Sequence, residues 1–402
     1  MQKKRHIHPS DIRALARLAT DATVGLTDLV EAMHHTVLRL PGKAEIQVPA
    51  RTGGIPGFVY KTVRGAARLA GGGVDTLLAQ LIPFFGERGS SPEREAVLAA
   101  LNGVLGDHMA RTGNALAIPM RLRQGGRPLR LEREALSAAI PDAGSRIVVL
   151  AHGLCMNDLQ WRRLGHDHGA ALAHDLGYTP LYLHYNSGLH TSVNGRALAH
   201  LLDELVKQWP QPVEELVIVG HSMGGLIARS AYHYGNAEAH AWLQHLRKLV
   251  FLGTPHHGAP LERIGNWVDV LLQATRYAAP FARLGKIRSA GITDLRHGNV
   301  VDEDWIGRDR FARAPDGRQP LSLPANVECY AIAATLGKTA GSIPDRVLGD
   351  GLVPLDSALG IHKDAARRLS LPPAQQWVAY ETGHLDLLSD PEVYSQIRKW
   401  LA

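Results

Sequence analysis

The pentapeptide Gly220-His221-Ser222-Met223-Gly224 carries the clearest chemical signal in this sequence. An apolar run leads directly into it, and an amphipathic helical pattern follows it. A Gly-x-Ser-x-Gly motif in this context is typical of a nucleophile elbow, a sharp strand-to-helix turn that lifts the serine hydroxyl above a sheet. Glycines flank the serine because side chains near such a turn must be very small. The pattern predicts that Ser222 is a nucleophile, and the alternative is a structural turn with an idle serine.

A serine nucleophile needs a base and a group that orients that base. After a nucleophile elbow, the expected chain order is first an acid and then a histidine. His384 directly follows the last apolar run and is the predicted general base, with a surface histidine as the alternative. Asp350, between two glycines, is the predicted acid. Asp356 and Asp386 are its rivals.

An oxyanion hole requires two backbone donors, one of them the N–H of the residue after the nucleophile. That residue is Met223, and the loop that follows an earlier apolar run predicts Leu154 as the second donor, with Cys155 as the next choice. We interpret Cys155 as a small packed residue and not as a second nucleophile. Four residues are candidates for the surroundings of the substrate pocket: His152, Cys155, His221 and His257.

Histidine pairs elsewhere raise the question of a metal. His256 and His257 are adjacent, and His166 and His168 are two residues apart. Neither pair shows a recognised ligand spacing with further partners. We therefore expect no metal and no cofactor, and we expect His257 to shape a loop beside the active site.

The chemistry-bearing motifs follow short apolar runs that alternate with helical patterns. Alternation of this kind predicts an α/β fold with a mostly parallel sheet and helices on both faces. A hairpin over Ala115–Leu131, with strands at 116–118 and 129–131 around a Gly125-Gly126 turn, would add antiparallel strands at one edge. The expected buried strands are Arg146–Ala151, Thr179–Tyr185, Leu216–Val219, Lys248–Leu252, Cys329–Ala333 and Gln376–Tyr380, and the clearest helices between them are Asn194–Trp209 and Gly224–Tyr234.

The same patterns predict a helical N-terminal region at residues 1–110, including helices at 10–40 and 92–110, and a hydrolase domain at 111–402. Residues 259–326 form a connection too long for a simple crossover, which indicates a cap or lid insertion. Together with the apolar stretch 50–86, this insertion could gate an acyl-chain pocket. Ordinary packing against the core is the simpler interpretation.

Charge and composition narrow the other possibilities. The net charge is +6, and all of this excess lies in residues 1–144, which hold 19 Lys/Arg against 13 Asp/Glu. Basic N-terminal helices can contact an anionic membrane surface peripherally, although a solvated helix face is the simpler interpretation. No nucleic-acid-binding module is recognised. With two cysteines, no secretory signal and no long apolar run, a cytoplasmic location is expected.

Taken together, four motifs resemble those of bacterial lipases and esterases of the α/β-hydrolase superfamily, and in particular the PGAP1-like group related to GPI inositol-deacylase. The resemblance covers about residues 115–402 and implies the α/β-hydrolase fold. Carried over by motif, it implies Ser222 as nucleophile, Asp350 as acid and His384 as base. Residues 1–110 lie outside the common pattern, so GPI anchors are not inferred as substrates. The motifs are 149–154, 220–225, 253–258 and 349–354.

The expected function is therefore hydrolysis of a carboxylic ester, of the acyl-ester or lipid-like class, through an acyl-enzyme. An acyltransferase or a thioesterase could use the same triad. A membrane- or protein-binding module with a relict hydrolase fold is the alternative from another class. The sequence makes no prediction about the oligomeric state.

Overall fold

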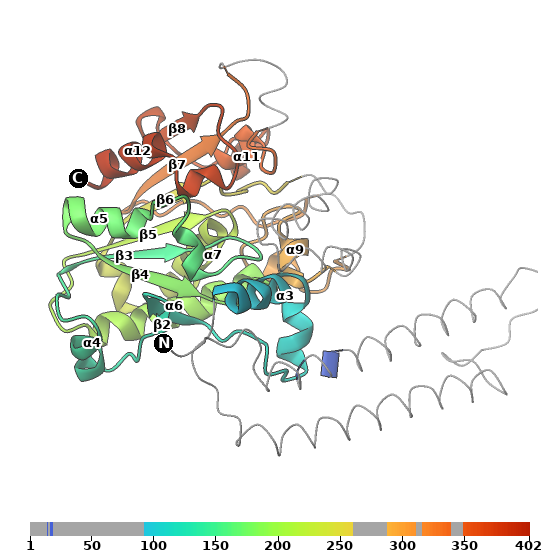
Figure 1. The fold of residues 1–402 in the computed structure, drawn as a ribbon. Coiled ribbons are helices and arrows are strands. Elements are labelled where there is room, and N and C mark those ends of the chain that lie inside the picture. The colour runs from blue at the N-terminus through green and yellow to red at the C-terminus, as the bar shows by residue number, and fades with distance from the viewer. Residues whose placement is uncertain (1–13, 15–16, 19–91, 260–287, 311–315, 339–348) are drawn as a thin grey trace, which may run out of the picture. The chain divides into compact units, whose positions relative to one another are not determined.

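The computed structural model describes residues 14, 17–18, 92–259, 288–310, 316–338 and 349–402. Three predicted features lie wholly or largely outside these residues: the N-terminal helical region, the apolar stretch 50–86 and residues 260–287 of the insertion. Within them, an eight-stranded sheet has the order β2-β1-β4-β3-β5-β6-β7-β8 (Figure 1). The strands are β1 Arg121–Gln124, β2 Arg127–Pro128, β3 Arg146–Ala151, β4 Thr179–His184, β5 Glu215–His221, β6 Leu246–Leu252, β7 Glu328–Ala334 and β8 Gln376–Ala379.

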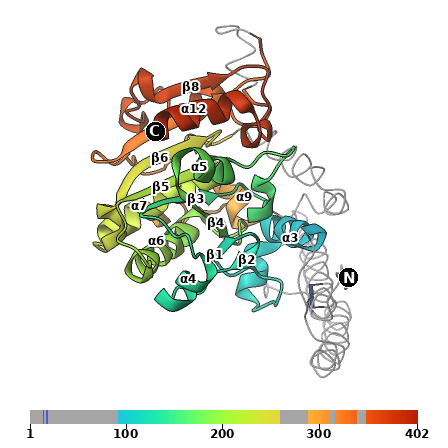
Figure 2. The same ribbon diagram turned by 60° about the vertical axis from the view of Figure 1, so that its left-hand side comes forward.

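Strands β3 to β8 run parallel, as the apolar runs predicted. All six expected strands are confirmed with ends shifted by a few residues at most. The central strands are buried almost throughout, because helices cover both faces of a parallel sheet and leave no polar alternation. Figure 2 shows β8 and the β1–β2 hairpin at opposite edges of the sheet. The predicted fold class is confirmed.

The hairpin at the edge of the sheet is confirmed, but the predicted positions of its strands are wrong. Strand β1 pairs antiparallel with both β2 and β4, and Gly125 and Gly126 form the turn with φ of 56° and 74°. A two-residue turn with both φ values positive places the paired strands directly on either side. The prediction instead followed the apolar triplets at 116–118 and 129–131, whereas a single buried Leu122 anchors β1.

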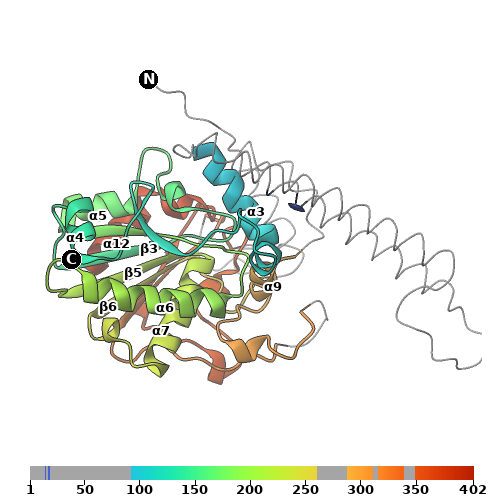
Figure 3. The same cartoon turned by 90° about the horizontal axis from the view of Figure 1, so that it is seen from below.

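Helices cover the two faces of the sheet (Figure 3). Helices α6 and α7 lie against one face, and α5 and α12 lie against the other. The predicted helices 92–110, 194–209 and 224–234 are found as α3, α6 and α7. The longer helices are α3 Pro92–Arg111, α5 His168–Leu176, α6 Thr191–Gln208, α7 Met223–Ala237 and α12 Pro391–Leu401, and the shorter ones are α4 Arg133–Ala139, α9 Ala290–Asp294 and α11 Leu355–Ala358.

Local signals in the sequence explain where several helices begin and end. Helix α5 begins after Asp167, whose carboxylate accepts the backbone N–H of Ala170, and ends at Gly177 with φ 71°. Helix α12 begins at Pro391 after the capping residue Asp390. Such caps satisfy backbone groups that the helix itself cannot pair. The described residues also contain single turns of 3-10 helix: η1 Asp158–Trp161, η2 Ala241–Gln244, η4 Asp302–Asp304, η5 Ala365–Arg367, η6 Pro373–Gln375 and η7 Asp386–Leu388.

The chain divides into two compact units, Met1–Arg94 with Met109–Leu116, and Glu95–His108 with Ala117–Ala402. In the first unit, the Asn114 side-chain amide donates to the carbonyl of Ala14. The second unit contains the sheet and everything discussed below. The boundary at residue 110 and the cap at 259–326 stay predictions. Among the described residues, no helix has both the length and the apolar character needed to cross a bilayer.

Candidate active site

Ser222 occupies the turn between β5 and α7, at the carboxyl edge of the sheet. Its φ is +55°, a left-handed conformation that side chains other than glycine rarely adopt, and its side chain is buried. The backbone N–H of Ser222 donates to Leu252 at the end of β6, and its carbonyl accepts from Gly225. These bonds hold the strained turn in place, as expected of a nucleophile elbow.

The glycines around Ser222 are required by close backbone approaches. A Cβ atom at Gly220 would lie 2.5 Å from the Cα of Gly225. At Gly224 it would lie 2.2 Å from the carbonyl oxygen of Ala151, at the end of β3. Both distances are too short for any side chain, so the elbow can form only with glycine at these positions.

The structure brings Asp350 and His384 together. His384 Nδ1 lies 2.6 Å from Asp350 Oδ2, and both side chains are buried. The other carboxylate oxygen of Asp350 accepts the backbone N–H groups of Leu352 and Val353, at 2.9 and 2.7 Å. Because the carboxylate is fully engaged, its position is fixed. Nδ1 of His384 carries the proton in this pair, which leaves Nε2 as the basic nitrogen.

The two rival carboxylates lie elsewhere. Asp386 accepts the backbone N–H of Gly383 and is half exposed beside Arg163. Asp356 lies in the first turn of α11. Neither carboxylate bonds to the ring of His384 in the described part of the chain.

His221, directly before Ser222, links the serine turn to His384. Its Nε2 donates to the backbone carbonyl of His384 at 3.0 Å, and the centroids of the two rings lie 4.7 Å apart. Gly253, after β6 and with φ +56°, lies so close that a Cβ atom there would be 3.1 Å from His384 Nδ1 and 3.2 Å from Asp350 Oδ2. The segments that follow β5, β6, β7 and β8 therefore meet at one place.

The predicted oxyanion loop lies next to the serine. A Cβ atom at Gly153 would be 3.1 Å from Ser222 Cβ. The Cys155 N–H donates to Ser187 Oγ at 3.0 Å, so it is already engaged, whereas no hydrogen bond from the Leu154 N–H is found among the described residues. Met223 is the first residue of α7, where the backbone N–H has no partner within the helix. This arrangement favours Leu154 over Cys155.

Burial keeps three of the predicted pocket residues uncharged: His152, Cys155 and His221. Burial lowers the pKa of His152 to about 4, although its Nδ1 donates to the carbonyl of Gly153 and its ring stacks on Tyr185. Burial also lowers the pKa of His221 well below its ordinary value. The pKa of the Cys155 thiol is raised to about 12, because the thiol is enclosed. Cys155 is therefore present as a thiol, which agrees with a packing role.

The remaining histidine candidates make contacts of their own. The backbone N–H of His257 donates to Ser357 Oγ at 3.1 Å, and its ring lies 4.8 Å from that of His362. His256 is buried, with Nδ1 3.4 Å from a nitrogen of Arg229. His166 and His168 bond to each other through Nε2 and Nδ1 at 2.8 Å. Neither pair forms part of a three-ligand cluster within the described residues.

Sequence reasoning missed the aromatic support of the site. Trp161 is fully buried, and its ring meets the rings of His221 and His168 edge to face, at 6.4 and 6.3 Å. The hydroxyl of Tyr185 donates to the carbonyl of His152 at 2.7 Å, which helps to fix the predicted oxyanion loop. No motif marks these residues, because each acts through a contact between distant parts of the chain.

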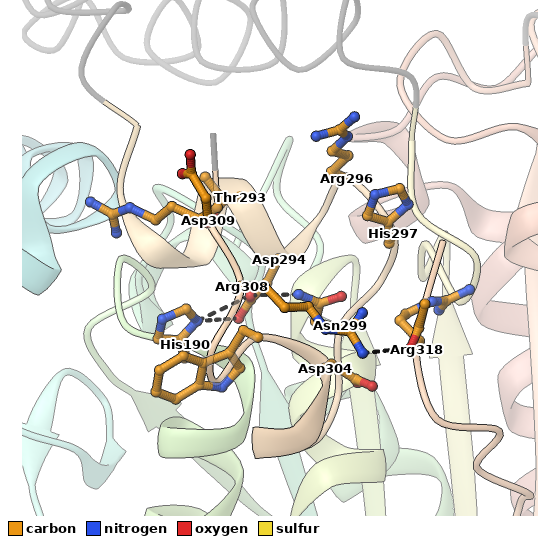
Figure 4. Close-up of a pocket in the computed structure, with 13 residues that line it drawn as sticks. His190, Thr293, Asp294, Arg296, His297, Asn299, Asp304, Arg308, Asp309 and Arg318 are labelled. Atoms are coloured by element: carbon orange, nitrogen blue, oxygen red, sulfur yellow. Dashed lines mark hydrogen bonds and ion pairs between the residues drawn. The ribbon is translucent and has the colours of Figure 1, made fainter. Parts of the chain in front are cut away.

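A pocket of about 60 Å³, lined mainly by residues with charged or polar groups, lies within the described part of the predicted insertion and beside the start of α6 (Figure 4). His190 Nδ1 bonds there to the carboxylate of Asp294, and its ring stacks on Trp305. Arg308 donates to the carbonyl of Gly317 at 2.7 Å. The other residues that line the pocket are Thr293, Arg296, His297, Asn299, Asp304, Asp309, Arg310 and Arg318.

Comparison with known proteins supports the fold. The family model described as the PGAP1-like alpha/beta domain matches residues 142–322. The match covers less than half of the chain, so the chain is similar to a PGAP1-like alpha/beta domain over that segment, and its fold is α/β. The matched segment includes the predicted oxyanion loop and Ser222 and ends before Asp350. No curated protein matches the chain in sequence.

Several solved structures are similar to this chain at low sequence identity. The mature lipase BlEst2 of Bacillus licheniformis is 18% identical with a TM-score of 0.43, over 71% of this chain and 98% of the lipase. A thermophilic esterase of Thermogutta terrifontis is 15% identical with a TM-score of 0.38, over 71% and 93% of the two chains. The Pf2001 esterase of Pyrococcus furiosus is 13% identical with a TM-score of 0.37, over 65% and 81%.

Proposed function

We propose that this α/β-hydrolase-fold protein hydrolyses carboxylic esters through an acyl-enzyme formed at Ser222. The observation that carries the proposal is the short bond between His384 Nδ1 and Asp350 Oδ2, next to a serine in a strained turn. A serine hydroxyl is a weak nucleophile by itself and requires a base that is held in one orientation. Asp350 fixes His384 in the tautomer whose Nε2 carries no proton and can act as the base.

In the first half of the reaction, Ser222 Oγ attacks the ester carbonyl carbon and its proton passes to Nε2 of His384. The tetrahedral intermediate then collapses, the bond to the leaving alcohol breaks, and the alcohol takes the proton from His384. In the second half, His384 removes a proton from water, which attacks the acyl-enzyme. The carboxylic acid leaves as Ser222 regains its proton.

The negative charge on the intermediate requires fixed donors. We propose the backbone N–H groups of Leu154 and Met223, one from the loop after β3 and the other from the first turn of α7. Removal of one such donor typically lowers kcat by about two to three orders of magnitude. The location of Met223 at the start of α7 adds the favourable end of the helix dipole.

The burial of nearby histidines supports this assignment. His152 and His221 stay neutral at physiological pH, since enclosure lowers the pKa of both. They therefore serve as hydrogen-bonding supports, and His384 is left as the base. We propose an acyl-ester or lipid-like small molecule as the substrate class, and we propose that residues 259–326 form a cap over the substrate.

The test is turnover of a series of p-nitrophenyl esters of increasing acyl length, measured for the wild-type protein and for Ser222→Ala. We expect the wild type to hydrolyse at least one ester and the variant to lose roughly a thousandfold or more. Equal activity of the two would reject Ser222 as the nucleophile. Product analysis with added alcohols separates a hydrolase from an acyltransferase, since only the latter forms new esters as its main product.

A further inference from the structure

Three side chains of metal-ligating type meet on the α6–α7 side of the sheet, outside the candidate active site. His200 comes from α6, Glu238 caps the end of α7, and His240 directly precedes η2. The Nε2 atoms of His200 and His240 lie 3.4 and 3.1 Å from the same oxygen, Oε2 of Glu238. The ligand atoms of all three residues lie within 4.8 Å of one another.

These distances suit a metal ion with tetrahedral coordination. Zinc binds imidazole nitrogen and carboxylate oxygen at about 2.0–2.2 Å, so neighbouring ligand atoms around it are roughly 3.3–3.5 Å apart. The two distances from Glu238 Oε2 are close to that range. The His200 side chain is 60% exposed, which allows its ring to turn and close the remaining gap to His240. Two imidazoles and one carboxylate favour zinc and related divalent transition metals over Ca²⁺ or Mg²⁺.

The backbone aims Glu238 and His240 toward the same place. Between them, Ala239 adopts a left-handed conformation with φ +54°. The N–H of His240 donates to the carbonyl of Gly235, and the N–H of Ala239 donates to Asn236, at 2.9 and 3.3 Å. This pair of bonds is a Schellman motif, in which glycine is usual at the position of Ala239. The turn is therefore well defined despite its strained residue.

A second anchor ties this turn to α6. Asp203, three residues after His200 on the same helix, accepts the backbone N–H of Ala241 at 2.6 Å. The side chain of His240 is 9% exposed and is thus held in place, whereas Glu238 is 36% exposed. His240 is therefore fixed by packing. His200 and Glu238 are open to solvent and can admit an ion with a bound water.

Arg196 does not occupy the place that an ion would take. Its guanidinium lies over the ring of Tyr234 at 3.8 Å and pairs with Asp302. Its distance to Glu238 is 3.8 Å, and that contact is to Oε1, not to the oxygen that faces the two histidines. The carboxylate of Glu238 can therefore serve Arg196 and a metal ion through different oxygens.

We propose that His200, Glu238 and His240 form a binding site for Zn²⁺ or a similar divalent transition metal, with water as the fourth ligand. The metal would join α6 to the C-terminal end of α7, the helix that begins directly after Ser222. It would act on stability and not in the ester reaction. No sequence motif marks this site, because its ligands come from separate elements of the fold.

The experiment uses full-length, tag-free protein freed of metal with a chelator. Titration calorimetry with Zn²⁺ should give one equivalent bound, and Co²⁺ should produce the visible absorption of a low-coordinate site. His200→Ala, His240→Ala and Glu238→Gln should each weaken Zn²⁺ binding by roughly tenfold or more. Thermal unfolding should shift upward with Zn²⁺ in the wild type and shift far less in the variants.

The matched control is His174→Ala. His174 is an exposed histidine whose Nδ1 bonds to the carboxylate of Asp175 at 2.7 Å. Among the described residues, no second histidine contacts that carboxylate. This variant should bind Zn²⁺ like the wild type. The proposal is overturned if the wild type binds no Zn²⁺, or if its affinity is unchanged in the three site variants. An equal loss in His174→Ala would overturn it as well.

Discussion

Two His–Asp pairs with buried carboxylates lie in the unit that contains the sheet, and they differ in what surrounds them. In the first, His384 Nδ1 bonds to Asp350 at 2.6 Å, close to the elbow that carries Ser222. In the second, His190 Nδ1 lies 3.1 Å from both oxygens of Asp294, and the His190 ring stacks on Trp305 with centroids 3.7 Å apart (Figure 4). The residue types are the same, so the pair alone does not define a catalytic site.

The carboxylates of the two pairs have different tasks. Asp350 is held by two backbone N–H groups of its own loop and directs its second oxygen at one histidine. Asp294 accepts the backbone N–H of Thr191 and the amide of Asn299 in addition to His190. It therefore joins the start of α6 to α9 and the following loop. We infer that the first pair serves chemistry and the second pair serves structure.

The largest expected effect is that of Ser222→Ala, which removes the nucleophile that distinguishes the first pair from the second. Turnover of a p-nitrophenyl ester should fall by roughly a thousandfold or more. The control is Ser192→Ala, because Ser192 Oγ accepts the indole N–H of Trp305 beside the second pair. This control should change turnover by less than about threefold. Similar losses in both variants would erase the distinction between the pairs.

The next effect is that of Asp350→Asn, which keeps the shape of the side chain and removes its charge. The amide can stabilise the wrong tautomer of His384, so kcat should fall by orders of magnitude, though less than in Ser222→Ala, while KM changes little. Stopped-flow or steady-state assays can measure this drop. Near-normal kcat in a folded Asp350→Asn protein would contradict the role of Asp350 in the reaction.

The dependence of the free energy of unfolding on pH tests the burial of His168. Burial lowers the pKa of His168 to about 4, and this outweighs the bond to the carbonyl of Leu387. The unfolded chain takes up this proton near pH 6.5, but the folded protein does so only near pH 4. The stability that His168 contributes above pH 6.5 is therefore lost as the pH falls toward 4, by about 3 kcal/mol.

His168→Gln isolates this contribution, since glutamine can still donate to the carbonyl of Leu387 but does not titrate. Urea unfolding at several pH values should show that the variant loses about 3 kcal/mol less than the wild type between pH 6.5 and 4. Identical slopes for the two proteins would mean that His168 is not enclosed as described.

The smallest effect on activity should come from Asp294→Asn in the second pair. This change weakens the bonds to His190 and Thr191, so the free energy of unfolding should fall by about 1–3 kcal/mol. Turnover should stay within about threefold of the wild type, because the pair has no role in the reaction. A loss of kcat as large as that of Asp350→Asn would show that the second pair takes part in catalysis.

The sequence predicted what depends on local pattern. The parallel strands were found because each is a short apolar run, and the serine turn was found because its glycines stand at fixed offsets. The contact of Asp350 with His384 could be anticipated from chain order, since both follow strands that end at the same edge of the sheet. The hairpin strands were misplaced because apolar triplets outweighed the geometry of the Gly125-Gly126 turn.

The rest depends on contacts between distant parts of the chain. No spacing relates His190 to Asp294, and none brings His200 next to Glu238. Trp161 reaches His221 only after β5 and the loop after β3 have packed side by side. Such groupings arise from the register of the sheet and the packing of helices, which a single sequence does not display.

If Ser222 forms a covalent intermediate, a fluorophosphonate probe should label its hydroxyl. Digestion and mass spectrometry should find one probe adduct on the peptide that contains Ser222. The adduct should be absent in Ser222→Ala and should form much more slowly in Asp350→Asn. An adduct at another residue, or no adduct on the folded wild-type protein, would rule out Ser222 as the nucleophile.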